Sequence, residues 1–411
     1  MEIHANFVEK IILILFAIKL PYMIKILVLI DLSTEFSRRF LSGLIQYAND
    51  NGSWTFYRLP SYYKTLYGGD GIIERIQEWG IDAVIAQWEY EEVDFLEQLN
   101  IPVFLQSYKN SISRFSKIAG NYKGVGIMAV RFFQQRGYHN FAYYGNTDFY
   151  WSKARAEGFR QEIESLNGNF SYFESEALND MHWGRSHIAL NDWLISLPKP
   201  VALLACDDNF ALQVSEMCKV NDINIPDELS LLGVDNDELI CNLSHPSISS
   251  IVTDDKKGGY FTGKMLHHAI KNKDTSPFNI IIEPIRIELR QSTEKYNISD
   301  KYISCVLNFI DQNITADLSI NELIEVVPLS RRNLEKKFRE ATGCSVYQYI
   351  LDKKVEYISN ELLTTDKSLL DIAIDVGFND VRNAYRIFKK KTGFTPMNYR
   401  EKFSQKSDPK K

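Results

Sequence analysis

The stretch SRRNLEKKFREATGCSVYQY, residues 330–349, recurs fifty residues later as DVRNAYRIFKKKTGFTPMNY, residues 380–399. The two copies share an Arg-Asn pair, a Phe, a Thr-Gly pair and a final Tyr at the same spacing. Each copy begins with a residue that favours a helix N-cap and reaches a Gly of the kind that ends helices. The repeat therefore predicts two copies of one small helical unit.

A shorter helical pattern precedes each copy, so the sequence predicts two helix-turn-helix units. Ser-x-x-Glu at Ser319 and Ser-x-x-Asp at Ser368 mark the start of the first helix of each unit. The predicted helices are 319–327 and 330–341 in the first unit, 368–376 and 379–391 in the second, and a joining helix at 346–361.

The second helix of each unit has one basic, polar face and one apolar face. Arg and Asn side chains can form paired hydrogen bonds with guanine and adenine edges in the major groove of DNA, and Lys can contact phosphates. A charged face that only meets solvent is the alternative, but it explains one such helix better than two matching ones. We therefore expect double-stranded DNA to be bound by Arg331, Arg332, Asn333, Lys336, Arg382, Asn383 and Arg386.

Residues 24–290 show a different pattern, in which short apolar runs alternate with amphipathic helical segments. Continuous apolar runs are typical of strands buried on both faces of a parallel sheet. The runs lie at 24–30, 83–86, 102–105, 141–144, 201–205 and 229–233, and the helices at 36–50, 70–79, 123–136, 151–166, 207–220 and 255–271. This is too much for one sheet, so the sequence predicts two α/β lobes with chain crossings near 119–125 and 250–290.

Polar side chains follow several predicted strands or begin the helices after them, where open parallel sheets bind ligands. Carboxylates and guanidinium groups bond strongly to hydroxyl groups, and an indole ring can cover the apolar face of a sugar. Taken singly, each residue could instead be a helix cap or its neighbour. Together they predict a pocket for a neutral polyhydroxylated ligand, formed by Asp31, Arg38, Trp88, Trp151, Arg155, Asp207, Asp235 and Asn236.

Charge is divided unevenly along the chain. Residues 1–300 carry 28 Lys and Arg against 38 Asp and Glu, whereas residues 301–411 carry 19 against 15. An acidic body joined to a basic C-terminal part indicates two regions with different partners. The five Cys form no C-x-x-C pair, and no phosphate-binding, nucleophile or zinc motif occurs, so we expect no catalytic residue, metal or cofactor.

The apolar run at 11–18 is too short to span a bilayer and lacks the flanks of a signal peptide. We therefore expect residues 1–23 to be an extension outside the fold, with a secretory signal as the alternative. No membrane association and a cytoplasmic location are expected. Residues 404–411 are expected to form a disordered tail.

Residues 301–403 resemble the DNA-binding domain of the arabinose-regulator (AraC/XylS) family. The likeness rests on PLSRRNLEKKF at 328–338, IAIDVGF at 372–378 and FKKKTGFTPMNYR at 388–400. Residues 24–290 resemble the two-lobed, periplasmic-binding-protein-like sensor domain of the lactose-repressor (LacI) family, and residues 291–300 then form a linker. That second likeness rests on CDD at 206–208, IPDELSLLGVDN at 225–236 and ISSI at 248–251.

The order of the two, sensor first and AraC-type domain last, resembles that of sugar-operon regulators that respond to xylose. This resemblance implies a homodimeric transcription activator that works with RNA polymerase and responds to xylose or a related pentose. It also implies that the sugar is clamped between the lobes by Arg38, Trp151, Arg155, Asp207 and Asp235. The alternatives are a sugar-acting enzyme with the helices as an accessory module, and an exported solute-binding protein.

Overall fold

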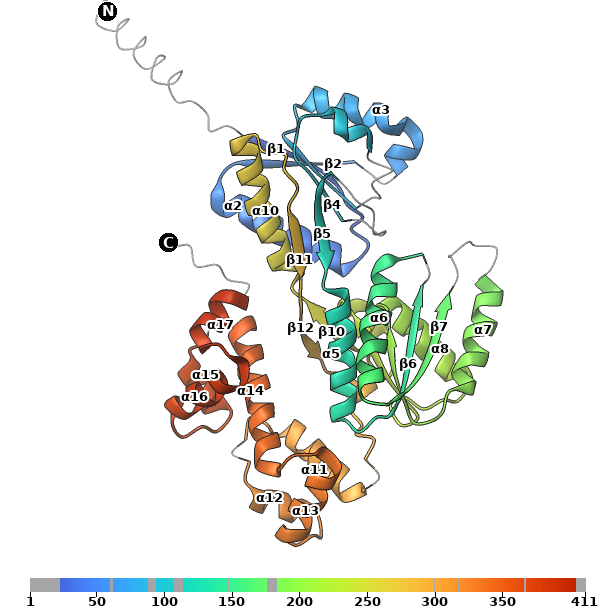
Figure 1. Cartoon of the computed structure of the whole chain (residues 1–411), viewed down its shortest axis with the longest axis vertical. Coiled ribbons are helices and arrows are strands. Elements are labelled where there is room, and N and C mark those ends of the chain that lie inside the picture. Colours follow the sequence, from blue (N-terminus) through green and yellow to red (C-terminus); the bar gives the residue numbers. More distant parts are fainter. Residues whose placement is uncertain are drawn as a thin grey trace, which may run out of the picture. The chain divides into compact units, whose positions relative to one another are not determined.

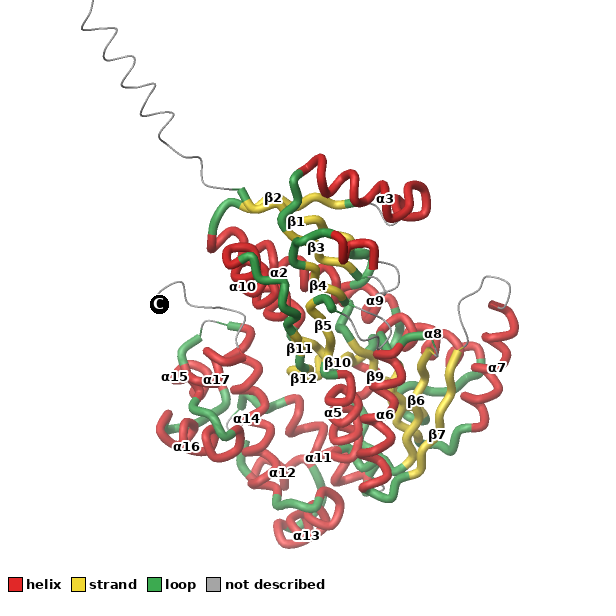
Figure 2. Tube along the Cα trace, turned by 45° about the horizontal axis from the view of Figure 1, so that its top comes forward, coloured by secondary structure: helices red, strands yellow, loops and turns green. Residues whose placement is uncertain are grey.

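The computed structural model describes residues 23–59, 62–87, 94–106, 114–146, 148–175, 183–298, 300–316, 318–365 and 367–403. Within these ranges, two six-stranded sheets with flanking helices are followed by a wholly helical C-terminal part (Figures 1 and 2). The predicted fold class is therefore confirmed. Residues 1–22, Trp88 and the tail at 404–411 lie outside the described residues. No described helix is both long and apolar enough to cross a membrane.

The first sheet has the strand order β11-β5-β4-β3-β1-β2, and the neighbours from β2 to β5 are parallel. Strands β3 and β4 are buried at every residue and β1 at nearly every one, which explains their continuous apolar sequences. The strands are β1 (Ile24–Leu29), β2 (Trp54–Arg58), β3 (Ala83–Ala86), β4 (Val103–Leu105), β5 (Ser116–Gly120) and β11 (Asn279–Ile282). The helices are α2 (Glu35–Asn51), α3 (Tyr62–Trp79), the short η1 (Asp94–Gln98) and α10 (Asp255–Asn272).

The second sheet has the order β12-β10-β9-β8-β6-β7, with only β12 antiparallel to its neighbour. Strands β6 to β10 lie in the same spatial order as strands β1 to β5 of the first sheet. The strand order reverses between β6 and β8, and ligands bind at such switch points in folds of this kind. The strands are β6 (Asn140–Asn146), β7 (Asn169–Ser175), β8 (Val201–Ala205), β9 (Leu229–Val234), β10 (Ser249–Thr253) and β12 (Pro284–Glu288). The helices are α5 (Tyr122–Gln135), α6 (Tyr150–Ser165), α7 (Trp183–Ser196), α8 (Asp208–Val220) and α9 (Glu238–Leu243).

Helices α5 and α6 run alongside each other (Figure 1) and touch through glycines. A Cβ on Gly126 would lie 2.3 Å from the carbonyl oxygen of Arg155, and one on Gly158 would lie 2.2 Å from that of Lys123. Only glycine allows the backbones to approach this closely. The crossing therefore fixes the position of α6, including Arg155.

The chain divides into two compact units, Met1–Ala119 with Asp255–Ile282, and Gly120–Asp254 with Glu283–Lys411. The helical C-terminal part thus groups with the second sheet. The polar stretch at 291–298 packs in two places: its 3-10 turn η3 (Gln291–Thr293) contacts β9 and β10 and buries Ser292 and Thr293, whereas Tyr296 is buried in the apolar core of the first helix-turn-helix unit.

The C-terminal part contains the two predicted helix-turn-helix units. Both predicted capping boxes form, at Ser319 with Glu322 and at Ser368 with Asp371. Gly343 and Gly393 end the second helices in left-handed conformation, with φ of 75° and 76°. The helices are α11 (Lys301–Gln312), α12 (Ile320–Val326), α13 (Arg331–Thr342), α14 (Val346–Thr364), α15 (Leu369–Asp375), α16 (Val381–Thr392) and α17 (Pro396–Phe403).

The repeat of fifty residues also appears in the packing. Phe338 meets Tyr349 edge to face with ring centroids 5.5 Å apart, and Phe388 meets Tyr399 in the same way at 5.2 Å. Both Phe side chains are fully buried, and each belongs to a separate apolar core. The shared Phe and Tyr of the sequence repeat are therefore the core pair of each unit.

Candidate functional site

Arg155 is the centre of a polar site at the carboxyl edge of the second sheet. Its residue is 5% exposed, and its guanidinium Nη2 donates a 3.1 Å hydrogen bond to Oδ1 of Asp235. Nη1 donates to the carbonyl oxygen of Cys206 at the end of β8, and the guanidinium carbon lies 4.9 Å from the ring centroid of Trp151. Three residues predicted for the ligand pocket, Trp151, Arg155 and Asp235, thus lie together.

The third guanidinium nitrogen of Arg155, Nε, is buried and has no hydrogen-bond partner among the described residues. A buried N–H without a partner costs free energy, of order 1–3 kcal/mol, unless a further group accepts its hydrogen bond. A hydroxyl oxygen of a ligand is a suitable acceptor.

Asp207 caps helix α8 next to this arginine, and its Oδ1 accepts a 2.9 Å hydrogen bond from the backbone N–H of Phe210. Burial raises the pKa of Asp207 to about 6, and the nearby charge of Asp235 adds to this effect. Asp207 is therefore a helix cap, which was the alternative interpretation of this residue. The same carboxylate also lies close to Arg155 and Asp235 in the polar site. When it is ionised, the Asp207 carboxylate is a strong acceptor of hydrogen bonds from hydroxyl groups.

The backbone at Asp235 and Asn236 is unusual. Both residues follow β9 in left-handed conformation, with φ of 93° and 50°. Asn236 is buried, and its N–H donates to the hydroxyl of Ser250 at 2.9 Å. Left-handed non-glycine residues cost free energy and tend to occur at functional sites. Here the turn presents the Asp235 carboxylate to Arg155.

Two further residues belong to this site: Asp208, which follows a predicted strand but was left out of the predicted set, and Tyr122, which the sequence analysis missed. Asp208 is buried, accepts hydrogen bonds from Ser250 Oγ at 2.6 Å and from Asp237 N at 2.7 Å, and has a pKa raised by burial. Tyr122, the first residue of α5, places its ring centroid 5.8 Å from the guanidinium carbon of Arg155. Its ring fills the space beside Gly120, where a Cβ would lie 2.5 Å from a ring carbon.

Asp31 lies in the first unit on the loop that joins β1 to α2, and Arg38 lies in the first turn of α2. The Asp31 carboxylate accepts hydrogen bonds from the N–H and hydroxyl of Ser33, and Arg38 Nη1 donates to the carbonyl oxygen of Ser33 at 2.6 Å. Arg38 also pairs with Glu35. Both predicted residues therefore order the same exposed loop at the carboxyl end of β1. Trp88 cannot be placed, as it lies outside the described residues.

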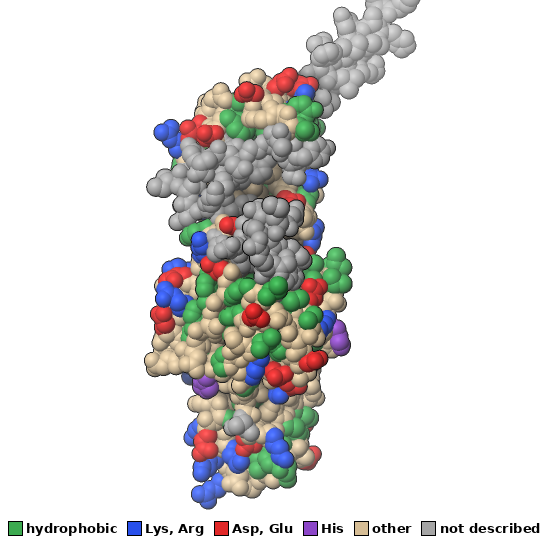
Figure 3. Space-filling view, turned by 90° about the vertical axis from the view of Figure 1, so that its right-hand side faces the viewer, with side chains coloured by type: hydrophobic (Ala, Val, Ile, Leu, Met, Phe, Trp, Pro, Cys, Tyr) green, Lys and Arg blue, Asp and Glu red, His purple; other side chains and the backbone are tan. Residues whose placement is uncertain are grey.

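The predicted DNA-binding residues lie on α13 and α16, the second helices of the two units. Arg331, Arg332, Asn333 and Lys336 are exposed on α13, and Arg382 and Arg386 on α16, with Asn383 half-buried. The opposite faces are buried through Leu334 and Phe338, and through Ala384 and Phe388. Arg332 and Arg382, at matching repeat positions, are thus both exposed, as are Lys336 and Arg386, whereas Asn383 is less exposed than Asn333. In Figure 3, Lys and Arg side chains are visible over the helical part, in the lower portion of the view.

The local partners of these side chains are weak ones. Arg382 pairs with Asp380 at 3.1 Å while its side chain is 89% exposed, and Arg331 pairs with Glu335 at 3.2 Å. Arg386 donates to Asn383 Oδ1 at 3.1 Å. Exposed ion pairs contribute only about 0–1 kcal/mol, so these groups can exchange their partners for phosphates or bases at little cost. Lys337 also forms an ion pair, with Asp300 at 2.5 Å, but its residue is half-buried and so presents less of its side chain to a partner.

Across the part of the chain that the structure describes, no group of three or more His, Cys, Asp or Glu side chains could hold a metal ion. The donors gathered around Arg155 instead suit hydrogen bonding to a neutral ligand.

Comparisons with known proteins agree with this division into two parts. A family model described as a periplasmic binding protein-like domain matches residues 130–293, and one described as a helix-turn-helix domain matches residues 323–402. The xylose operon regulatory protein of Haemophilus influenzae is 27% identical over 385 residues, covering 92% of this chain and 98% of that protein. Its Escherichia coli K12 counterpart is 24% identical over 386 residues, covering 92% and 97%.

A solved structure of a xylose-binding transcription activator has the same fold, with a TM-score of 0.58 and 22% identity, covering 93% of this chain and 99% of that one. The predicted order of domains is thereby confirmed. Along nearly its whole length the chain is similar to xylose operon regulatory proteins, and it combines a region that matches a periplasmic binding protein-like domain with one that matches a helix-turn-helix domain.

Proposed function

We propose that this protein is a transcriptional regulator that binds double-stranded DNA and responds to a pentose, xylose or a close relative. Residues 24–290 act as the sugar sensor, residues 301–403 as the DNA-binding domain, and residues 291–300 join them. One observation carries the proposal: Arg332 and Arg382 are exposed at matching positions of two repeated helices, in a chain that also pairs the buried Arg155 with the half-buried Asp235 at a sheet edge.

The sugar site combines charged acceptors and donors with aromatic rings. Asp207 and Asp235 accept from sugar hydroxyls, Arg155 donates to them, and Trp151 covers an apolar sugar face. Asp31, Arg38, Trp88 and Asn236 complete the proposed set. A pentose is favoured because both full-length relatives are named as xylose operon regulators.

The DNA contacts follow from the repeat. In helix-turn-helix proteins the second helix lies in the major groove, and α13 and α16 would occupy successive grooves about 34 Å apart. Arg331, Arg332, Asn333, Arg382, Asn383 and Arg386 read base edges or contact backbone, and Lys336 contacts phosphate.

Sugar binding changes DNA binding because a ligand favours whichever conformation it binds more tightly. The two affinities are then coupled reciprocally, so that DNA also changes the affinity for sugar. We further propose that the protein acts in the cytoplasm as a homodimer, and that it activates transcription through contact with RNA polymerase.

The enzyme alternative is set aside because the relatives that match the whole chain are named as operon regulators. An exported solute-binding protein would have no use for two matched recognition helices.

A DNA-binding experiment tests the assignment of the recognition helices. Duplexes are selected in vitro with the unmodified protein, and their affinity is measured by fluorescence anisotropy. Arg332→Ala and Arg382→Ala should each lose about 1–3 kcal/mol of specific binding. Lys337→Ala is the control, because Lys337 is held by Asp300 and should affect DNA affinity much less. Unchanged affinity and footprints for both Arg variants would contradict the assignment.

A thermal-shift screen across pentoses and hexoses tests the sugar. A specific ligand raises the melting temperature because it binds only the folded state. At a ligand concentration of a hundred times its Kd, the free energy of unfolding rises by about 2.7 kcal/mol. We expect D-xylose or a related pentose to give the largest shift. No shift with any sugar would contradict the proposed sensor.

A further inference from the structure

The segment after the second sheet is bonded to that sheet by small hydroxyl side chains. Ser292 Oγ accepts a hydrogen bond from Ser249 N at 2.8 Å and donates one to the carbonyl oxygen of Leu231 at 2.6 Å. Ser249 Oγ lies 2.7 Å from Thr293 Oγ1. Ser249 begins β10, and its neighbour Ser250 bonds to Asp208 and Asn236 in the sugar site. The segment is therefore attached one residue away from the proposed sugar site.

The same segment is bonded to the helical domain through Tyr296. This side chain is 1% exposed, and its hydroxyl lies 2.6 Å from both Asp311 Oδ2 on α11 and the hydroxyl of Tyr349 on α14. Asp311 also pairs with Lys353 of α14 at 3.3 Å. Helix α14 joins the two helix-turn-helix units, so Tyr296 is fixed to the element that holds both of them.

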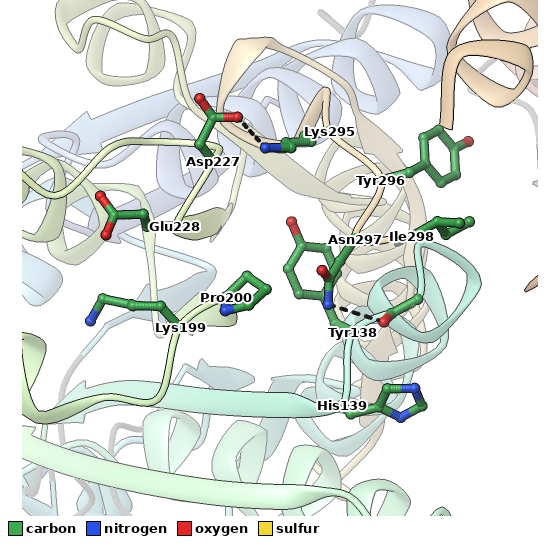
Figure 4. Close-up of a pocket in the computed structure, with 11 residues that line it drawn as sticks. Tyr138, His139, Lys199, Pro200, Asp227, Glu228, Lys295, Tyr296, Asn297 and Ile298 are labelled. Atoms are coloured by element: carbon green, nitrogen blue, oxygen red, sulfur yellow. Dashed lines mark hydrogen bonds and ion pairs between the residues drawn. The ribbon is translucent and has the colours of Figure 1, made fainter. Parts of the chain in front are cut away.

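Arg136 connects these two sets of contacts. It is 2% exposed, its guanidinium carbon lies 5.0 Å from the Tyr296 ring centroid, and Nη2 lies 3.7 Å from Asp311 Oδ2. Its Nε donates to the carbonyl oxygen of Thr293 at 3.3 Å, and its own carbonyl oxygen accepts from Asn297 N at 2.7 Å. Tyr296 and Asn297 border a groove of about 580 Å³, in which Tyr138, Lys295 and Asp227 also lie (Figure 4).

Helix α5 links Arg136 to the sugar site. The helix begins at Tyr122, beside Arg155, and Arg136 is its C-cap. Fourteen helical residues span about 21 Å, and a helix of this length that packs tightly against a neighbour moves as one body. A sugar that displaces Tyr122 at the start of α5 would therefore also displace Arg136 at its end.

We propose that Arg136 and Tyr296 are positioning residues that transmit the state of the sugar site to the DNA-binding domain. This inference rests on the proposed function, and it adds the contacts that link the sugar site to the DNA-binding domain. Apolar packing alone would hold the two domains together in many similar arrangements. Buried hydrogen bonds and a buried guanidinium demand one geometry, because a misaligned polar group in a low-dielectric interior loses its partner.

Removal of single hydroxyl groups tests this connection in the full-length protein. Tyr296→Phe and Tyr349→Phe each delete one side of the 2.6 Å contact and keep the rings in place. Tyr144→Phe is the matched control: Tyr144 is also 1% exposed, but its hydroxyl donates to Gln213 Oε1 at 2.9 Å, and neither residue belongs to the connection. Calorimetry measures the affinity for D-xylose, and anisotropy measures the affinity for a selected duplex with and without D-xylose.

The decisive quantity is the ratio of DNA affinities with and without D-xylose, which is typically 5–150-fold in coupled systems. In Tyr296→Phe and Tyr349→Phe we expect this ratio to fall toward one, while D-xylose affinity and sugar-free DNA affinity stay within about threefold of the unmodified protein. Tyr144→Phe should keep the full ratio. A full ratio in Tyr296→Phe would overturn the inference. A ratio of one in the unmodified protein with every pentose would instead overturn the proposed function, and the inference with it.

Discussion

Replacement of Asp207 by Asn changes the charge of the proposed sugar site and leaves its shape almost intact. Burial raises the pKa of this carboxyl from 3.8 to about 6. Because each pKa unit corresponds to about 1.4 kcal/mol, an ionised Asp207 costs the fold at most about 3 kcal/mol at neutral pH. Part of Asp207 remains exposed, and solvent screening reduces the cost, so we expect about 1–2 kcal/mol. Asn caps helices as well as Asp and keeps the bond from Phe210 N.

The sign of the effect follows from the direction of the shift. A carboxyl with a higher pKa when folded binds its proton more tightly in the folded state, so its contribution to stability falls as pH rises from about 4 to about 6. Asp207→Asn should therefore be more stable than the unmodified protein at pH 7, and the difference should vanish toward pH 4. For a domain of this size the melting temperature should rise by about 2–4 °C per kcal/mol.

Calorimetric melts at pH 4, 5, 6 and 7 measure this difference. Asp237→Asn is the matched control, since Asp237 caps α9 in the same manner and should shift stability by less than about 0.5 kcal/mol. A variant less stable than the unmodified protein at pH 7, or a difference that stays constant with pH, would refute the electrostatic reasoning. The variant should also lose its thermal shift with D-xylose, because the stability gained comes at the expense of a ligand-binding charge.

Three substitutions test other parts of the molecule. Gly126→Ala adds a Cβ only 2.3 Å from the Arg155 carbonyl oxygen, so α5 and α6 must separate; melts should show about 1–3 kcal/mol of destabilisation, and calorimetry a weaker affinity for D-xylose. Asp235→Ala removes the partner of Arg155 and should abolish the effect of D-xylose on DNA affinity while sugar-free DNA binding, followed by anisotropy, persists. Gly393→Ala puts a side chain at φ of 76° and should lower the melting temperature by the equivalent of about 1 kcal/mol without changing D-xylose affinity.

The buried parallel strands could be predicted from the sequence because burial on both faces makes them continuously apolar. The edge strand β2 was missed, since its residues are mostly half-buried. Strand β10 was missed for the opposite reason: it is buried throughout, but it starts with Ser249 and Ser250, whose hydroxyls are satisfied by bonds to Thr293 and Asp208. Apolarity identifies only those buried residues that need no hydrogen-bond partner.

The grouping of residues at the proposed sugar site could be predicted in part because parallel sheets bring the ends of their strands to one edge. This rule indicated Trp151, Arg155, Asp207 and Asp235, which the structure brings together. Tyr122 was not indicated, because β5 has the sequence SKIAG and is hard to recognise as a strand. The N-cap Asn121, whose side chain accepts from Gly124 N at 3.0 Å, was the available sign that a helix begins there at a strand end.

The polar stretch at 291–298 shows a deeper limit of sequence reasoning. Its composition indicates a loose linker, yet Ser292, Thr293 and Tyr296 are buried. Each is satisfied by a residue distant in sequence, such as Leu231 for Ser292. No local pattern encodes such a bond, because a hydroxyl group has the same sequence signature whether it faces water or a backbone carbonyl.

The use of arginine at both ends of α5 gives this limit a functional meaning. Arg155 lies beside Tyr122 at the start of the helix, and Arg136 lies beside Tyr296 at its end. A buried guanidinium is tolerated only where charges and acceptors are well placed, so each end of the helix favours one alignment. A sugar that supplies a hydrogen-bond acceptor to Arg155 changes the preferred alignment of α5 at its first residue. Because the helix is rigid, its position at Arg136 changes as well. A protein that needed only a firm joint would gain more stability from apolar side chains at Arg136 and Tyr296. The polar joint is therefore better explained by signalling than by stability.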